Sequence, residues 1–257
     1  MKKDIFLKTI TTVVDPDDSP QAKAFYFRFF PEYMQSETIL APGFRGDTLI
    51  SLGWTFGARN KTGSFNPSLR SYTRLFEKEE IQLFYKFRSQ YHSVANFVVF
   101  PCTLNVFRGS LQNSNNKGQG TCDYPDIFLE QVRKFYLNLP ITEKESQYVI
   151  PYASWLNYYG TGLSGWKSFL RKNYLLPFVN KNFEVKDLFA PPMEYKNDAT
   201  KDLVGTHHGF NYALPRCSPN HTKAPLPLGK ERALNFLNNA LWVFESRAAW
   251  LASAEMH

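Results

Sequence analysis

The sequence has few cysteines and no long apolar run, and both features restrict the class of protein. Three cysteines, Cys102, Cys122 and Cys217, occur in 257 residues and form no CxxC pair, which excludes a disulfide-dense secreted scaffold. No stretch approaches the roughly 18 uninterrupted apolar residues of a membrane helix. Charged residues also interrupt the first residues before a signal-peptide apolar region forms. We therefore expect a cytoplasmic protein with reduced thiols and no membrane partner.

The basic residues are not gathered into runs, although the chain as a whole is positively charged. Lys and Arg number 30 against 23 Asp and Glu, which gives a net charge of +7 and a pI near 9.2. Because no run of Lys and Arg occurs, the sequence has no basic arm or localisation signal. The net charge still favours attraction to nucleic acid or another polyanion, as a property of the whole surface.

Aromatic residues are abundant, at 16% of the chain. Rings dominate the burial of apolar surface, so this composition favours a core built from aromatic packing. The alternative is a surface that stacks on planar ligands such as bases. A chain of this length buries roughly three quarters of its unfolded surface. We therefore expect one globular domain, residues 1–257, and no cofactor.

Segments with strand character come mostly before residue 110, and segments with helical spacing mostly after it. Ring content predicts a strand at 25–30, alternation predicts one at 81–87, and an apolar run predicts a central strand at 94–100. Helix starts are expected at Asn66–Pro67 and near Asp123. These patterns predict an α+β fold, in which a mainly antiparallel sheet from the N-terminal part is covered by four or five helices from the C-terminal part.

Two later helices have clear apolar faces. In the first, Ser164 is the expected cap, and Lys167 and Arg171 lie opposite an inward face. The second spans roughly 230–251, and its apolar residues step by three and four: Leu234, Leu237, Leu241, Phe244, Ala248 and Leu251. A face of this width favours burial under the rest of the domain. The alternatives are a homodimer through this C-terminal helix, or a non-catalytic module that docks another protein there.

Histidines gather in the segment 206–223. His207, His208, Cys217 and His221 occur in an order that resembles a compressed His-Asn-His nuclease box, in which histidines activate water and hold a divalent metal. However, two residues separate His208 from Asn211, too few for that family's β-hairpin. As a zinc site the segment offers three ligands and no evident fourth. The interpretation that we favour is a proline-rich surface loop, with a metal-dependent nuclease as the alternative.

Arginines near predicted loop and helix ends are the other candidates for a site. A guanidinium can bind phosphate or carboxylate through two parallel hydrogen bonds. The competing interpretation, which the sequence favours, is pairing with nearby acids such as Asp123 or Asp126. The candidates for binding an anion or nucleic acid are Arg59, Arg70, Arg74 and Arg108, together with Tyr72.

Several of these residues lie in motifs that resemble an uncharacterised bacterial domain family of unknown function. The similarity runs from about residue 50 to 190 and rests on five segments: 66–72, 97–101, Arg108-Gly109, 128–136 and 165–170. The chain departs from the family at 57–60, where the family has acidic residues. The resemblance implies one domain, supplies no activity, and marks Arg70, Tyr72, Arg108 and Gly109 for testing.

The sequence contains no complete catalytic signature, so whether the protein is an enzyme stays open. Charge, aromatic content and arginine placement together favour a soluble protein that binds nucleic acid or another polyanion. The metal-dependent nuclease and the protein-interaction module are the alternatives.

Overall fold

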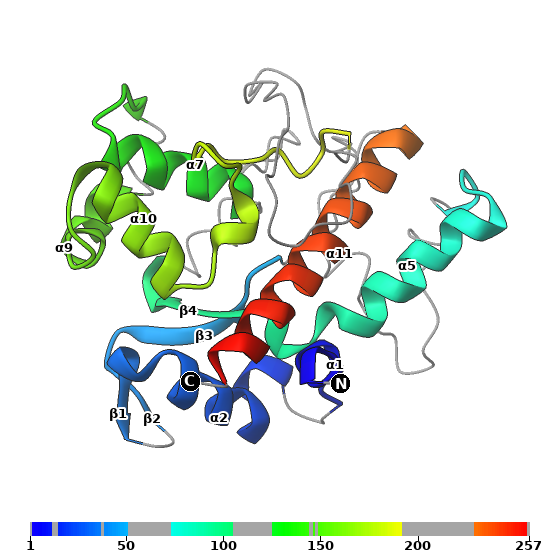
Figure 1. The fold of residues 1–257 in the computed structure, drawn as a ribbon, viewed down its shortest axis with the longest axis horizontal. Helices are drawn as coiled ribbons and strands as arrows, with labels where there is room; N and C mark the ends of the chain where they lie inside the picture. Colours follow the sequence, from blue (N-terminus) through cyan, green and yellow to red (C-terminus); the bar gives the residue numbers. More distant parts are fainter. Residues whose placement is uncertain are drawn as a thin grey trace.

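A computed structural model of the chain shows a mixed α and β structure, as the sequence predicted (Figure 1). Two small antiparallel sheets come from the N-terminal half, and most of the described helical residues lie in elements of the C-terminal part. The structure describes residues 2–11, 15–36, 39–50, 73–104, 125–143, 146, 149–191 and 229–255.

The N-terminal part begins with helices rather than strands. It holds α1 (Lys2–Leu7), η1 (Pro16–Asp18), α2 (Pro20–Phe29) and η2 (Pro31–Tyr33). The strand predicted at 25–30 is therefore wrong, because that segment is the second half of α2. The Ser19 side chain caps this helix by accepting a hydrogen bond from the Ala22 amide at 3.1 Å. Its buried residues, Ala22, Phe25, Tyr26 and Phe29, step by three and one around one helical face.

The strands form two separate two-stranded sheets. β1 (Met34–Ser36) pairs with β2 (Ile39–Leu40), and β3 (Phe44–Thr48) pairs with β4 (Phe97–Pro101), both antiparallel. β4 is buried along its whole length, as its apolar run predicted, although 94–96 is the 3-10 helix η3 (Val94–Asn96). The predicted central position is wrong, because within the described residues β4 pairs with β3 alone. The β3–β4 ladder runs from Phe44 opposite Pro101 to Thr48 opposite Phe97.

The strand predicted at 81–87 is also wrong, because this segment lies in α5 (Lys78–Tyr91). A capping box starts the helix: Glu77 is the cap, and the Glu80 carboxylate accepts a hydrogen bond from the Glu77 amide at 2.7 Å. Phe84, Phe87 and Tyr91 form the buried face. Their spacing of three and four residues outweighs the local alternation that resembles a strand.

The C-terminal part is helical and surrounds the long last helix. Its elements are α7 (Pro125–Tyr136), η4 (Ile150–Tyr152), α9 (Ala153–Asn157), α10 (Gly162–Lys172), η5 (Leu176–Phe178) and α11 (Gly229–Ala254). α11 crosses the middle of the molecule and packs against α1 and α5, while α7, α9 and α10 lie together on the other side (Figure 1). Among the described residues, no helix is both long and apolar enough to span a membrane.

The predicted apolar face of α11 is buried inside this chain. Leu237, Leu241, Phe244, Ala248 and Leu251 are all at most 4% exposed. This confirms the interpretation that the sequence favoured, and it leaves the dimer interface and the docking module without support from this face.

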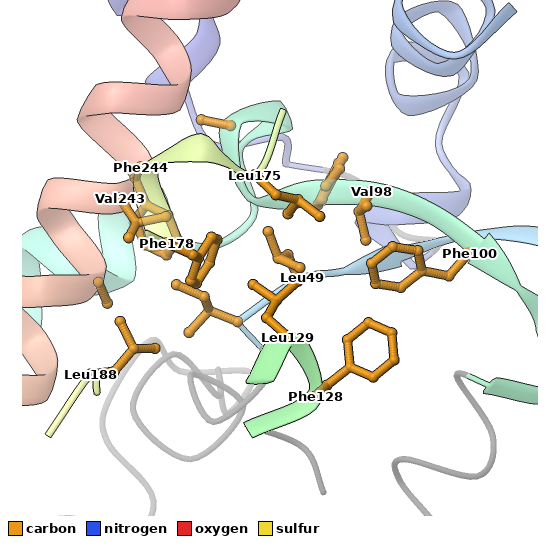
Figure 2. Close-up of a cluster of buried hydrophobic side chains, with 14 of the residues drawn as sticks. Leu49, Val98, Phe100, Phe128, Leu129, Leu175, Phe178, Leu188, Val243 and Phe244 are labelled. Atoms are coloured by element: carbon orange, nitrogen blue, oxygen red, sulfur yellow. The ribbon is translucent and has the colours of Figure 1, made fainter. Parts of the chain in front are cut away.

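The core joins the sheet to helices from both halves of the chain. Figure 2 shows Phe100 of β4 facing Phe128 of α7, while Phe244 of α11 lies at the other side of the same cluster, beside Phe178. Phe100 and Phe128 have ring centroids 5.5 Å apart. The abundant rings are thus used largely for packing, as the favoured interpretation of the composition required.

An arginine without a carboxylate partner among the described residues holds the core elements together. The Arg247 side chain of α11 is fully buried and donates hydrogen bonds to the carbonyls of Tyr174 at 2.9 Å, Ala95 at 2.5 Å and Phe97 at 2.8 Å. Burial lowers the pKa of Arg247 to about 9. Three carbonyl dipoles replace the hydration that the guanidinium loses, so one side chain connects α11 with η3, β4 and the turn after α10.

Candidate anion-binding surface

The residues proposed from the sequence fall mostly outside the described part of the chain. Arg74 is described; it lies just before α5 and is exposed. Arg59, Arg70, Tyr72 and Arg108 lie outside the described residues, as do all four candidate metal ligands: His207, His208, Cys217 and His221. The anion-binding role of these residues and the metal site therefore stay predictions.

Helix α10 is amphipathic because its apolar residues recur at helical spacing. Trp166, Phe169 and Leu170 are fully buried, as the sequence predicted. The expected cap is wrong: the cap position is Thr161, and Ser164 lies inside the first turn, where its hydroxyl donates to the Thr161 carbonyl at 3.1 Å.

The helix ends in a tight turn that directs the chain into the core. The Leu175 amide donates to the Leu170 carbonyl at 2.8 Å, and Tyr174 between them adopts a positive φ of 55°. The last turn of α10 therefore stands at the surface, with Arg171 and Lys172 exposed, while the chain that follows it turns inward.

Basic side chains occupy the outer face of α10 and the turn packed against it. The Trp166 indole donates to the Phe183 carbonyl at 2.8 Å, and the Lys167 ammonium lies 4.3 Å from the Phe183 ring centroid. These contacts hold the 180–183 turn on the helix, and Lys181 in that turn is exposed. We refer to the following four residues as the α10 basic surface: Lys167, Arg171, Lys172 and Lys181.

Among the described residues, no acid pairs with the α10 basic surface. Within the part of the chain that the structure describes, none of its four side chains forms an ion pair. The nearby Glu184 carboxylate accepts a hydrogen bond from the Asn180 amide at 2.8 Å instead. Other basic side chains have carboxylate partners at 2.7 to 3.1 Å, namely Arg28, Arg45, Lys86, Arg133 and Lys230.

The sequence also contains a signal for this surface. No Asp or Glu occurs between Glu145 and Glu184, a segment that contains all four basic residues. Sequence spacing placed Lys167 and Arg171 on the outer face, but it could not bring Lys181 to them, because the 180–183 turn reaches the helix through tertiary contacts.

An exposed ring stands beside the start of α10. Tyr158, directly after α9, is 68% exposed, the largest exposed fraction among the large hydrophobic residues described. Hydroxyl groups of Ser164 and Ser168 share the outer face of the helix. Because α10 contains no His, Cys, Asp or Glu, its surface supplies charge and hydrogen-bond donors rather than acid–base chemistry.

Carboxylates gather near the N-terminus, at the turn before α2. Burial, then a hydrogen bond and charge repulsion from Asp15, raises the pKa of Asp17 to about 8, with smaller contributions from Asp47 and Asp18. The Tyr26 hydroxyl donates to the Asp17 carbonyl oxygen at 3.0 Å, which fixes the turn on α2.

A second charged group with a displaced pKa lies near α11. Burial lowers the pKa of Lys186 to about 7. Its ammonium donates to the Pro177 carbonyl at 3.1 Å and lies 3.9 Å from the Trp242 ring centroid. Both contacts hold the ammonium against the protein rather than in water.

Comparison with known proteins adds no assignment: no family model, curated protein or solved structure matches this chain significantly. The resemblance to a bacterial family of unknown function therefore stays a prediction, and the geometry of the described residues carries the functional argument.

Proposed function

We propose that this protein binds nucleic acid or another polyanion through the α10 basic surface. One observation carries the proposal: four basic side chains gather on a helix and its adjoining turn with no ion pair among the described residues. Unpaired Lys and Arg are the groups that contact phosphate oxygens and release counterions on binding.

The neighbouring groups fit the same ligand class. Serine hydroxyls and exposed rings accompany basic residues at nucleic-acid surfaces, where hydroxyls bind phosphates and rings stack on unpaired bases. Ser164, Ser168 and Tyr158 supply both kinds of group beside the basic residues. The net charge of +7 adds a long-range attraction for any polyanion.

The test compares two triple variants with the same change in charge. Arg171→Gln, Lys172→Gln and Lys181→Gln remove the exposed part of the surface and leave Lys167 on the Phe183 ring. Lys8→Gln, Lys23→Gln and Lys78→Gln form the control, because these lysines are also exposed and have no ion pair among the described residues. Fluorescence anisotropy with labelled single-stranded and duplex oligonucleotides, between about 50 and 200 mM salt, measures binding.

We expect the first variant to bind more weakly at every oligonucleotide sequence and to lower the salt slope by about 2 to 3, roughly one for each lost phosphate contact. The control is expected to keep the wild-type slope. A wild-type protein that binds no oligonucleotide and no heparin at low salt would refute the proposal, as would equal losses in both variants.

A further inference from the structure

Exposed apolar side chains accompany the basic residues in the acid-free segment between Glu145 and Glu184. Tyr158 is 68% exposed, and Leu163, in the first turn of α10, is 46% exposed. Leu163 lies one helical turn before Lys167, on the same side of the helix. Single exposed apolar residues are ordinary on protein surfaces, but these two adjoin basic side chains that form no ion pair among the described residues. The surface therefore offers apolar contacts as well as charge.

The ring of Tyr158 is open to a planar ligand. Among the described residues its one ring contact is with Tyr159, edge to face, with centroids 5.3 Å apart and an interplanar angle of 83°, and its hydroxyl forms no hydrogen bond. An edge-to-face contact covers at most one face of a ring. Because most of the Tyr158 side chain is exposed, the other face of its ring is available for stacking.

The neighbouring residues hold the backbone of Tyr158 beside α10. Tyr159 is buried, and its ring packs on that of Phe169 in α10, with centroids 5.3 Å apart. The chain then turns at Gly160 with a positive φ of 101°, and a Cβ atom at Gly165 would lie 2.5 Å from the Gly160 carbonyl carbon. This close approach fixes the start of α10 against the residues that precede it. Because the backbone at Tyr158 is already ordered, stacking on its ring costs less conformational entropy.

We propose that the ligand of the α10 basic surface is single-stranded nucleic acid, whose phosphates contact the basic side chains and of which one unpaired base stacks on Tyr158. The bases of a duplex are already stacked on their neighbours, so an exposed ring gains this contact only with unpaired bases. Heparin and other polyanions without bases contact the charges alone. Leu163 adds an apolar contact at the same end of the helix. The inference rests on the proposed function and narrows it to one class of ligand.

The test separates bases from phosphates by using three labelled probes of one length, about 15 nucleotides. They are a single-stranded oligothymidylate, a strand with the same backbone that is abasic throughout, and the duplex of the first strand with oligoadenylate. Fluorescence anisotropy with the full chain measures the Kd of each probe between about 50 and 200 mM salt. We expect the wild type to bind the oligothymidylate about tenfold more tightly than the abasic strand, since one stacked base contributes a factor of about 5 to 150.

Tyr158→Leu is expected to lose this preference and to bind the duplex as the wild type does. Its salt slope should stay unchanged, because stacking releases no counterions, whereas the loss of Arg171, Lys172 and Lys181 lowers the slope. Tyr158→Trp keeps a ring for stacking and should retain the preference. Tyr85→Leu is the matched control, since Tyr85 of α5 is also an exposed tyrosine.

A wild type that binds the oligothymidylate and the abasic strand equally would overturn this inference and leave the proposed polyanion binding in place. An undiminished preference in Tyr158→Leu, or an equal loss on the duplex, would also overturn it, with circular dichroism confirming that the variant is folded. A wild type that binds none of the three probes and no heparin would remove both proposals. Binding to phosphatidylserine vesicles in place of oligonucleotides would assign the surface to an anionic membrane and would likewise overturn the inference.

Discussion

At the scale of single residues, Gly46 of β3 leaves no room for a side chain against Tyr26 of α2. A Cβ atom at Gly46 would lie 2.2 Å from the Tyr26 ring, well inside contact distance. The ring cannot easily move, because it is 1% exposed and its hydroxyl is bound to the Asp17 carbonyl. The absence of a side chain at Gly46 therefore lets α2 pack directly on the sheet.

Replacing Gly46 with Ala is expected to lower the free energy of unfolding by about 3 kcal/mol, since a fixed ring must be displaced. Urea unfolding followed by fluorescence measures the change. The double variant with Tyr26→Leu should recover part of the loss, because the smaller side chain leaves room for the methyl group. Additive losses in the double variant would show that the contact with Tyr26 is not the cause.

Lys186 leads to a prediction about pH. Its pKa is about 7 in the folded chain and ordinarily 10.5, so between these values the unfolded state binds more protons. Stability should therefore rise with pH across this window. Between pH 7 and pH 10, the free energy of unfolding of the wild type is expected to rise by on the order of 3 kcal/mol relative to that of Lys186→Met.

Urea unfolding of wild type and variant at several pH values tests this expectation. Lys78→Met serves as the control, because Lys78 is exposed. The stability of this variant should change with pH as that of the wild type does. If the free energy of unfolding of Lys186→Met also changes with pH as that of the wild type does from pH 7 to 10, burial does not lower the pKa of this lysine in solution.

At the scale of elements, local patterns predicted helices with a strong apolar face and failed where rings were dense. α10 and α11 were recognised because their apolar residues recur every three or four positions. The segments 25–30 and 81–87 resemble strands in sequence, because Phe and Tyr favour strands and adjacent apolar residues obscure the helical period. The caps at Ser19 and Glu77 are the local signals that would have corrected both.

The candidate site shows the same division between local and distant signals. The outward direction of Lys167 and Arg171 follows from helical spacing, and the acid-free segment between Glu145 and Glu184 is visible in the sequence. The position of Lys181 depends on the Phe183 contacts with α10, which connect residues more than ten positions apart. Contacts between segments so far apart produce no periodic pattern in the sequence.

At the scale of the whole molecule, Arg247 connects parts of the chain that are distant in sequence. Arg247→Met is expected to lower the free energy of unfolding by about 3–5 kcal/mol, or to prevent folding, because three buried carbonyls lose their donor. Arg247→Lys should recover part of this loss, since an ammonium can reach fewer of the carbonyls. Urea unfolding, or the soluble yield where folding fails, provides the measurement.

The control for this prediction is Arg28→Met. Arg28 makes an exposed ion pair with Glu255, and its removal should cost less than about 1 kcal/mol. A loss at Arg247 as small as that at Arg28 would show that the three hydrogen bonds contribute little to holding α11 in place.

The sequence by itself determined the composition of the core, the α+β class, a buried strand within the apolar run 94–100 and the inward face of the last helix. These properties depend on residue type and on spacing along a few turns, which local chemistry decides. Only the tertiary structure decided that Arg247 is buried against carbonyls, that the η1 turn packs on β3, and that the 180–183 turn lies on α10. Each of these depends on which surfaces pack together, and that choice minimises the exposed apolar area of the whole chain rather than of any one segment.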